Sequence, residues 1–304
     1  MAKNSAAESR KWDYVILPKR SWFDIDLRGL WHYRDLCLMY VKRNFITTYK
    51  QTVLGPAWFV IQPLFTIVMY MFVFGGLAGI PTSAGEGSQE IPQQLFYMAG
   101  ILLWNYFSDC FSSSSNIFVS NHHVFGKVYF PRLVVPLSGL LSCLIKLLIQ
   151  TVVLIVIYTV CSMSSHNFSM NWSLLLFPVL IVMTALHGMS WGLIVSSMTY
   201  KYRDLQILIG FVMQLLMYAT PIVYPLAFVH EKAVTNGGIY VLLESFIKLN
   251  PMTSILEAFK YGCFTVTGIL DWWGLLYSFV FMVVVTTGSV LLFNKVERNF
   301  MDCV

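Results

Sequence analysis

The chain has 304 residues, of which 57% are hydrophobic and only 12% are charged, and its formal net charge is +5. Soluble domains carry about 25% charged residues, so this composition excludes a soluble globular protein and indicates an all-α integral membrane protein that crosses the bilayer several times. The positive charge does not indicate nucleic-acid binding, because ten of the twenty Lys and Arg residues lie within the first 50 positions.

The N-terminal region is polar and basic. Residues 1–26 lack the apolar core of a secretory signal peptide, so we expect a flexible cytoplasmic N-terminus there. Apolar residues such as Leu27, Trp31 and Leu38 then recur at helical spacing opposite cations, which predicts an amphipathic helix over residues 27–48. Such a helix suits the headgroup plane of a membrane or the surface of a partner protein.

Six segments are apolar and long enough to cross a bilayer, which takes roughly 20 residues of helix. We expect the spans near residues 53–75, 94–118, 134–160, 173–198, 205–224 and 272–293. In the fourth span, Gly188, Gly192 and Ser196 stand four residues apart. Such a small-residue stripe predicts close packing against another helix.

Lys and Arg residues in the loops set the expected orientation, because they accumulate on the cytoplasmic side. One face receives sixteen of these cations, and the other receives three, all within residues 225–271. Both termini are therefore expected in the cytoplasm, with residues 49–304 forming one transmembrane domain.

The segment 225–271 contains two short amphipathic stretches, one around residues 239–249 and one from Asn250-Pro251 to Gly262. Each has about a dozen residues, too few to cross ~30 Å of hydrocarbon. We expect a re-entrant or surface-lying outer helix pair between spans five and six. The pair either caps a conduit or contributes only to packing.

Two ionisable residues lie within predicted spans, Asp109 in the second and Lys146 in the third. Both are expected roughly 14–18 Å from the inner face at 1.5 Å of rise per residue. Antiparallel neighbouring helices could place them opposite each other. They would then form either a structural ion pair or a site for proton or ion coupling.

Sequence motifs for catalysis or cofactor binding are absent. The pattern GxxxxGK[ST] does not occur, so we expect no P-loop ATP hydrolysis by this chain. No zinc motif occurs, and the six cysteines are scattered without CxxC spacing, so we expect neither a metal nor a cofactor. A membrane enzyme for lipid-linked sugars would need clustered carboxylates or histidines, whereas the acidic residues of the outer loops are dispersed.

An ordered series of motifs covers much of residues 27–262. The first is Tyr49-Lys-Gln-Thr-Val-Leu-Gly-Pro-Ala-Trp58, followed by Gln62-Pro63. The others are Trp104-Asn-Tyr-Phe107, Lys127-Val-Tyr-Phe-Pro-Arg132, Tyr202-Arg-Asp204, Thr220-Pro-Ile-Val-Tyr-Pro225 and Leu249-Asn-Pro251. The series resembles the permease subunits of type-2 ABC exporters for O-antigen, teichoic acid or capsule.

This resemblance implies a transport subunit that works as two copies with two separate nucleotide-binding ATPase subunits, which would hold the ATP and Mg. The substrate would be a polysaccharide linked to undecaprenyl diphosphate, and O-antigen is the glycan we expect. It would move from the cytoplasm to the periplasm across a bacterial inner membrane. Helix 27–48 would lie beside the ATPase, and region 225–271 would form an outer gate. Loop 119–133 would couple the subunits through Asn121, His122, His123, Val124 and Phe125.

The resemblance also implies two sets of substrate contacts. Aromatic residues would line a sugar channel, with Trp58, Phe59, Tyr70 and Tyr218 as candidates. Cations at the inner entrance would bind the carrier diphosphate, or else they would contact anionic membrane lipid. The candidates are Arg43, Lys50, Lys127 and Arg132. The sequence departs from the family at Lys146, where an acidic or neutral residue is expected. Two alternatives to ATP-driven export are an ion-coupled secondary transporter using Asp109 and Lys146, and a membrane enzyme acting on a lipid-linked sugar.

Overall fold

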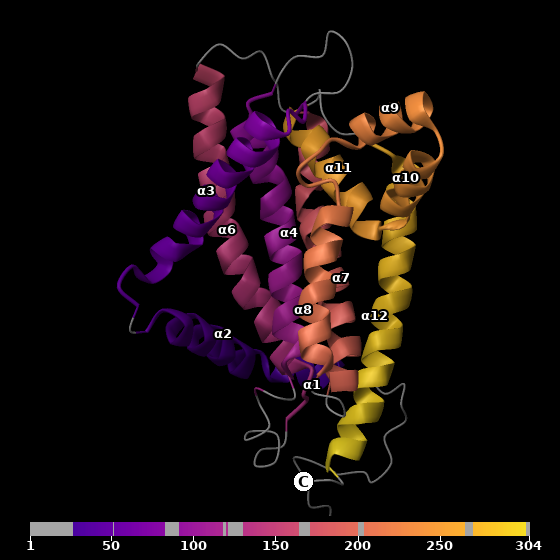
Figure 1. Cartoon of the computed structure of the whole chain (residues 1–304). Coiled ribbons are helices and arrows are strands. Elements are labelled where there is room, and N and C mark those ends of the chain that lie inside the picture. Colours follow the sequence, from indigo (N-terminus) through magenta and orange to yellow (C-terminus); the bar gives the residue numbers. More distant parts are fainter. Residues whose placement is uncertain are drawn as a thin grey trace, which may run out of the picture.

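The computed structural model describes residues 27–50, 52–82, 91–117, 120, 130–163, 171–199, 204–264 and 270–301. In these ranges every regular element is a helix. The long helices form one bundle, shown in Figure 1. At one end lie α1 (Leu27–His32), α2 (Arg34–Tyr49) and the last turns of α12 (Trp272–Met301). At the other end lie α9 (Leu226–Asn236), α10 (Ile239–Leu249) and α11 (Pro251–Phe264).

Four helical segments in the described part of the chain are long and apolar enough to cross a membrane. The first is Gly55–Leu77, which comprises η1 (Gly55–Ala57), α3 (Trp58–Tyr70) and η2 (Met71–Leu77). The second is α6 (Val134–Met163). The third is Trp172–Thr199, which comprises η3 (Trp172–Leu176) and α7 (Phe177–Thr199). The fourth is most of α12. These four confirm helices at the first, third, fourth and sixth predicted spans.

The second and fifth predicted spans are also helices, but neither is both long enough and apolar enough to be counted among the membrane-crossing segments. The helix α4 (Gln93–Ser115) has 23 residues, yet Asn105, Asp109 and the run Ser112–Ser115 make it less apolar. It lies at the centre of the bundle, where most of its side chains are buried. The helix α8 (Leu205–Ala219) has 15 residues, about 22 Å at 1.5 Å each, and is shorter than the hydrocarbon thickness. The topology of six spans therefore stays a prediction.

The small-residue stripe on α7 packs against α4, as predicted. A Cβ atom added at Gly188 would lie 2.8 Å from the carbonyl oxygen of Phe107. One added at Gly192 would lie 2.6 Å from the carbonyl oxygen of Phe111. Glycine therefore permits the two backbones to approach closely, in the way small residues do between membrane helices.

The helix α8 ends before Pro221, although the fifth span was predicted to continue to about residue 224. Proline lacks an N–H donor and disfavours helical geometry in the preceding residue, and Thr220 is accordingly extended. Although the charge count places Lys260 among the outer loop cations, its side chain has no exposed surface. Its Nζ donates to the carbonyl oxygens of Pro221 at 2.5 Å and Ile222 at 3.5 Å.

Residues 27–48 form two helices instead of one, because the backbone of Tyr33 leaves helical geometry between α1 and α2. Figure 1 shows α2 lying across the end of the bundle, where it packs against α6. The predicted outer pair is present as α10 and α11. A third short helix, α9, precedes them, joined to α10 by Gly237 and Gly238, which both have positive φ.

Replacing Lys260 by Met is expected to lower the free energy of unfolding by about 2–4 kcal/mol. Two carbonyl groups lose their donor, and the buried carboxylate of Glu257 loses a nearby cation. Thermal unfolding of the detergent-solubilised protein measures the change. Lys232→Met on α9 is the control, because Lys232 is exposed and should change stability by less than about 0.5 kcal/mol. Equal midpoints for the two variants would contradict the assignment.

The contact between α9 and α10 is expected to weaken in acid. Glu244 Oε1 accepts from Lys248 Nζ at 2.6 Å and from His230 Nδ1 at 2.8 Å. These two hydrogen bonds, of which the one from Lys248 has the larger effect, hold the pKa of Glu244 below its ordinary value of 4.5. The ionised carboxylate therefore stabilises the contact fully above pH 4.5, and its contribution is lost as the pH falls through the lowered pKa. Amide-exchange protection of α9, corrected for intrinsic rates, should fall between pH 6 and pH 3. In Glu244→Gln it should already be low at pH 6, and an unchanged profile would count against this role.

Candidate functional site

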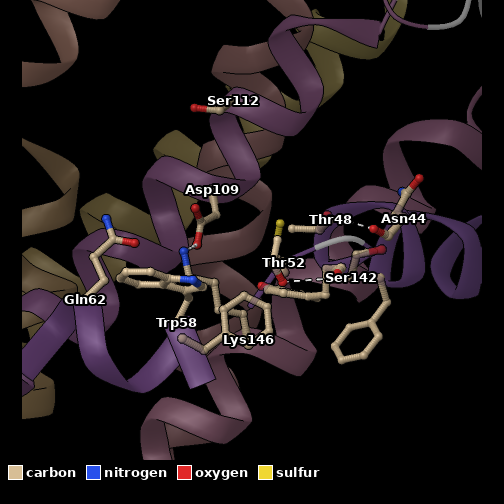
Figure 2. A pocket seen from close by; sticks show the side chains of 13 residues that line it. Asn44, Thr48, Thr52, Trp58, Gln62, Asp109, Ser112, Ser142 and Lys146 are labelled. Atoms are coloured by element: carbon tan, nitrogen blue, oxygen red, sulfur yellow. Dashed lines mark hydrogen bonds and ion pairs between the residues drawn. The ribbon is translucent and has the colours of Figure 1, made fainter. Parts of the chain in front are cut away.

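A cavity of ≈ 440 Å³ lies between α2, α3, α4 and α6 (Figure 2). This volume falls in the range of about 300–1,000 Å³ that is typical of small-ligand sites. The lining combines hydroxyl, amide and aromatic side chains around one pair of charges. The lining residues are Asn44, Phe45, Thr48, Tyr49, Thr52, Trp58, Phe59, Gln62, Asp109, Ser112, Ser142, Cys143 and Lys146.

Asp109 and Lys146 meet in this cavity. Lys146 Nζ lies 2.8 Å from Asp109 Oδ2, with the two side chains 23% and 33% exposed, respectively. The helices α4 and α6 run antiparallel, which brings the two predicted intramembrane charges to one level (Figure 1). Figure 2 shows the two groups pointing toward each other, with Trp58 and Gln62 beside them. The pair is electrically neutral as a unit.

Aromatic rings from α2 and α3 form another part of the cavity wall. Phe59 packs edge-on against Tyr49, with ring centroids 4.7 Å apart, and the ammonium of Lys146 lies 5.9 Å from the Phe59 centroid. Trp58 is 47% exposed at the same end of α3. Burial raises the pKa of Tyr49 to about 12, so its phenol remains protonated and can donate a hydrogen bond at neutral pH.

The four aromatic residues predicted to line one channel do not gather at one place. Trp58 and Phe59 line the cavity, but Tyr70 lies at the other end of α3, about 18 Å further along the helix. Its hydroxyl lies 3.8 Å from Met217 Sδ on α8, next to Tyr218, which is exposed. The structure therefore separates the predicted set into two groups.

The predicted diphosphate-binding cations occupy different environments. Arg43 is exposed on α2 and Lys50 is exposed directly after it, and Arg43 Nη2 donates to Oδ1 of the cavity residue Asn44 at 3.2 Å. Arg132 is only 4% exposed, so its guanidinium is not presented on the surface. Lys127 lies outside the described residues. Two of the four cations are thus available near the cavity.

The coupling residues Asn121, His122, His123, Val124 and Phe125 also lie outside the described residues. The end of the predicted loop is described from Phe130 onward. Its ring lies 6.2 Å, between centroids, from that of Tyr40 on α2. The loop therefore returns to the bundle beside α2.

Several cavity residues were not predicted from the sequence. Ser112 stands three residues after Asp109 on α4, and Ser142 stands four residues before Lys146 on α6. Residues at these spacings share one helix face. A search for polar residues spaced in this way around each intramembrane charge would have found both serines. Asn44 and Thr48 line the cavity only because α2 packs beside it, and no sequence pattern predicts that placement.

Comparison with known proteins gives one family and several relatives. The family described as ABC-2 type transporter matches residues 35–264. An O-antigen export system permease protein RfbA from Myxococcus xanthus is 24% identical over 235 residues, covering 77% of this chain and 82% of that protein. Two proteins of the same name from Klebsiella pneumoniae are each 23% identical over 269 residues, covering 88% of this chain and 94% of theirs.

The ion pair in the cavity is expected to show energetic coupling in a double-mutant cycle. Asp109→Asn and Lys146→Met each remove one partner, so the double variant should be less destabilised than the sum of the single variants, by about 0.5–3 kcal/mol. The exposed pair Arg34 and Asp35, 3.8 Å apart, is the control and should show coupling near zero. Thermal unfolding in detergent gives all the values. Additive effects at Asp109 and Lys146 would show that the pair does not act as a unit.

Proposed function

Because the chain belongs to the ABC-2 type transporter family, we propose that it is the membrane-spanning subunit of an ATP-driven exporter for a lipid-linked polysaccharide. The observation that carries the proposal is the match to relatives named O-antigen export permeases over 88% of this chain. The four apolar helices support the same conclusion, since they make the chain a multi-pass membrane protein.

The full proposal names the substrate, the assembly and the direction. The substrate is O-antigen linked to undecaprenyl diphosphate, and two copies of the chain form the channel in a bacterial inner membrane. The excess of Lys and Arg in one set of loops supports cytoplasmic termini and export toward the periplasm. The exposed cations Arg43 and Lys50 meet the carrier diphosphate on the cytoplasmic side. The helices α9–α11, at the opposite end of the bundle, close the outer mouth (Figure 1).

A separate ATPase supplies the energy. The chain has no P-loop motif, and ATP and Mg bind to two copies of the partner subunit. The loop 119–133 and α2 form the ATPase-facing surface. The helix α2 lies at the end of the bundle away from α9–α11, and Phe130, near the end of the loop, packs against Tyr40 of α2.

Export into the lumen of inverted inner-membrane vesicles is expected to require both this chain and its partner ATPase. His123→Glu and Phe125→Ala in the coupling loop should each lower ATP-dependent export at least about fivefold, because they alter the coupling between subunits. Thr235→Glu is the control, since it introduces the same new charge as His123→Glu on the exposed surface of α9, away from the predicted coupling loop in the sequence. Assembly of the complex is checked by co-purification of the ATPase.

Two results would contradict the proposal. Export that proceeds without any ATPase, and that is lost in Asp109→Asn, would instead support an ion-coupled transporter. Unaltered export in both loop variants would remove the assignment of the coupling loop.

A further inference from the structure

The charges inside the cavity cancel each other. The ammonium of Lys146 is already paired with the carboxylate of Asp109 at 2.8 Å, and no further charged side chain among the described residues lines the cavity. An anion bound at Lys146 would lie next to the carboxylate of Asp109, and the repulsion between the two negative charges is unfavourable where water is partly excluded. The cavity is therefore suited to an uncharged ligand.

The remaining lining groups suit a polyol ring. Thr48, Thr52, Ser112 and Ser142 provide hydroxyls, and Asn44 and Gln62 provide amides. The ion pair adds a strong acceptor in Asp109 and a strong donor in Lys146, and charge-assisted hydrogen bonds are stronger than neutral ones. The exposed indole of Trp58 stands beside the pair and offers a flat apolar surface (Figure 2). Alternating hydroxyls and apolar C–H faces are the chemistry of a sugar ring.

We propose that the cavity between α2, α3, α4 and α6 binds an uncharged sugar unit of the glycan. Asp109 and Lys146 hydrogen-bond its hydroxyls, and Trp58 covers one face of the ring. This inference rests on the proposed function, because it takes the substrate to be a glycan. It adds a discrete recognition site, separate from the second aromatic group at Tyr70 and Tyr218.

The position of the cavity agrees with its size and with the neighbouring charges. Its volume of ≈ 440 Å³ accommodates one or two sugar rings and is too small for a long polymer. Arg43 is hydrogen-bonded to the cavity residue Asn44, and Lys50 follows the cavity residue Tyr49, so two exposed cations stand next to residues of the cavity wall. A sugar next to the carrier diphosphate can therefore occupy the cavity while the phosphates lie at these cations.

Short-chain glycosides provide a direct test. The purified full chain, in nanodiscs free of glycolipid, is titrated with n-hexyl glycosides of glucose, galactose, mannose and N-acetylglucosamine. Two matched probes accompany them: hexyl tetrahydropyranyl ether, which has the ring without its hydroxyls, and hexyl phosphate. Saturation-transfer NMR of the probe protons gives the binding, and competition with methyl glycosides excludes simple partitioning of the alkyl chain.

At least one glycoside is expected to bind at least tenfold more tightly than either control probe. A site that hydrogen-bonds hydroxyls rejects an analogue without them, since its polar groups are left unpaired. Trp58→Leu and Gln62→Leu should each weaken glycoside binding at least fivefold. Both side chains are exposed in the cavity wall, so both variants should fold, as checked by size-exclusion chromatography. Trp272→Leu, at the exposed start of α12, is the control and should bind as the parent does.

Four outcomes would overturn the inference. They are the absence of glycoside binding, preferential binding of hexyl phosphate, equal binding of the tetrahydropyranyl ether, and glycoside binding unaffected by both Trp58→Leu and Gln62→Leu. The vesicle assay keeps this result distinct from the proposed function. ATPase-dependent export with no glycoside binding would retain the exporter and remove the sugar site. Glycoside binding without ATPase-dependent export would retain the sugar site and remove the exporter.

Discussion

The buried ammonium of Lys260 holds the end of α8 to the rest of the molecule. Where α8 stops before Pro221, the chain leaves carbonyl groups without helical partners, and such groups are costly in an apolar environment. Lys260 on α11 donates to two of them and lies 3.8 Å from the ring centroid of Phe96 on α4. Asn250, which precedes α11, adds a hydrogen bond from its amide to Thr220 Oγ1 at 3.0 Å. The turn after α8, the short helix α11 and the central helix α4 are thus joined at one point.

The central position of α4 makes this arrangement possible. A Cβ atom at Gly100 would lie 2.7 Å from the carbonyl oxygen of Ile222, so the turn after α8 rests directly on the α4 backbone. Lower on the same helix, α7 approaches through Gly188 and Gly192. At the same level of α4, Asp109 turns toward α6 and the cavity. One helix therefore carries the packing contacts on some faces and the polar site on another, which explains its low apolar content.

Patterns that depend on one segment alone were predicted well. Hydrophobic length located four of the spans, and the i,i+4 spacing of Gly188 and Gly192 predicted a close helix contact, because both follow from helix geometry. The depths of Asp109 and Lys146 could be estimated because the rise per residue is fixed. The burial of Lys260 could not be predicted, since its partners are carbonyl groups 38 and 39 residues earlier in the chain. For the same reason, sequence did not reveal that Trp58 and Phe59 face the ion pair while Tyr70 reaches α8.

The cavity shows why an ion pair in a membrane protein need not serve either packing or ion coupling alone. A pair that only packed two helices together would have its remaining donors and acceptors satisfied by other protein groups, since burial otherwise costs more than the attraction returns. Asp109 and Lys146 instead remain partly exposed, at the wall of a cavity that also presents hydroxyls, amides and an indole. Each charge fixes the other's position without using all of its hydrogen-bonding capacity, since a carboxylate has further acceptor sites and an ammonium has three donors. A neutral ligand can therefore gain strong hydrogen bonds from both groups while the pair stays intact, so that recognition incurs no cost for separating the charges.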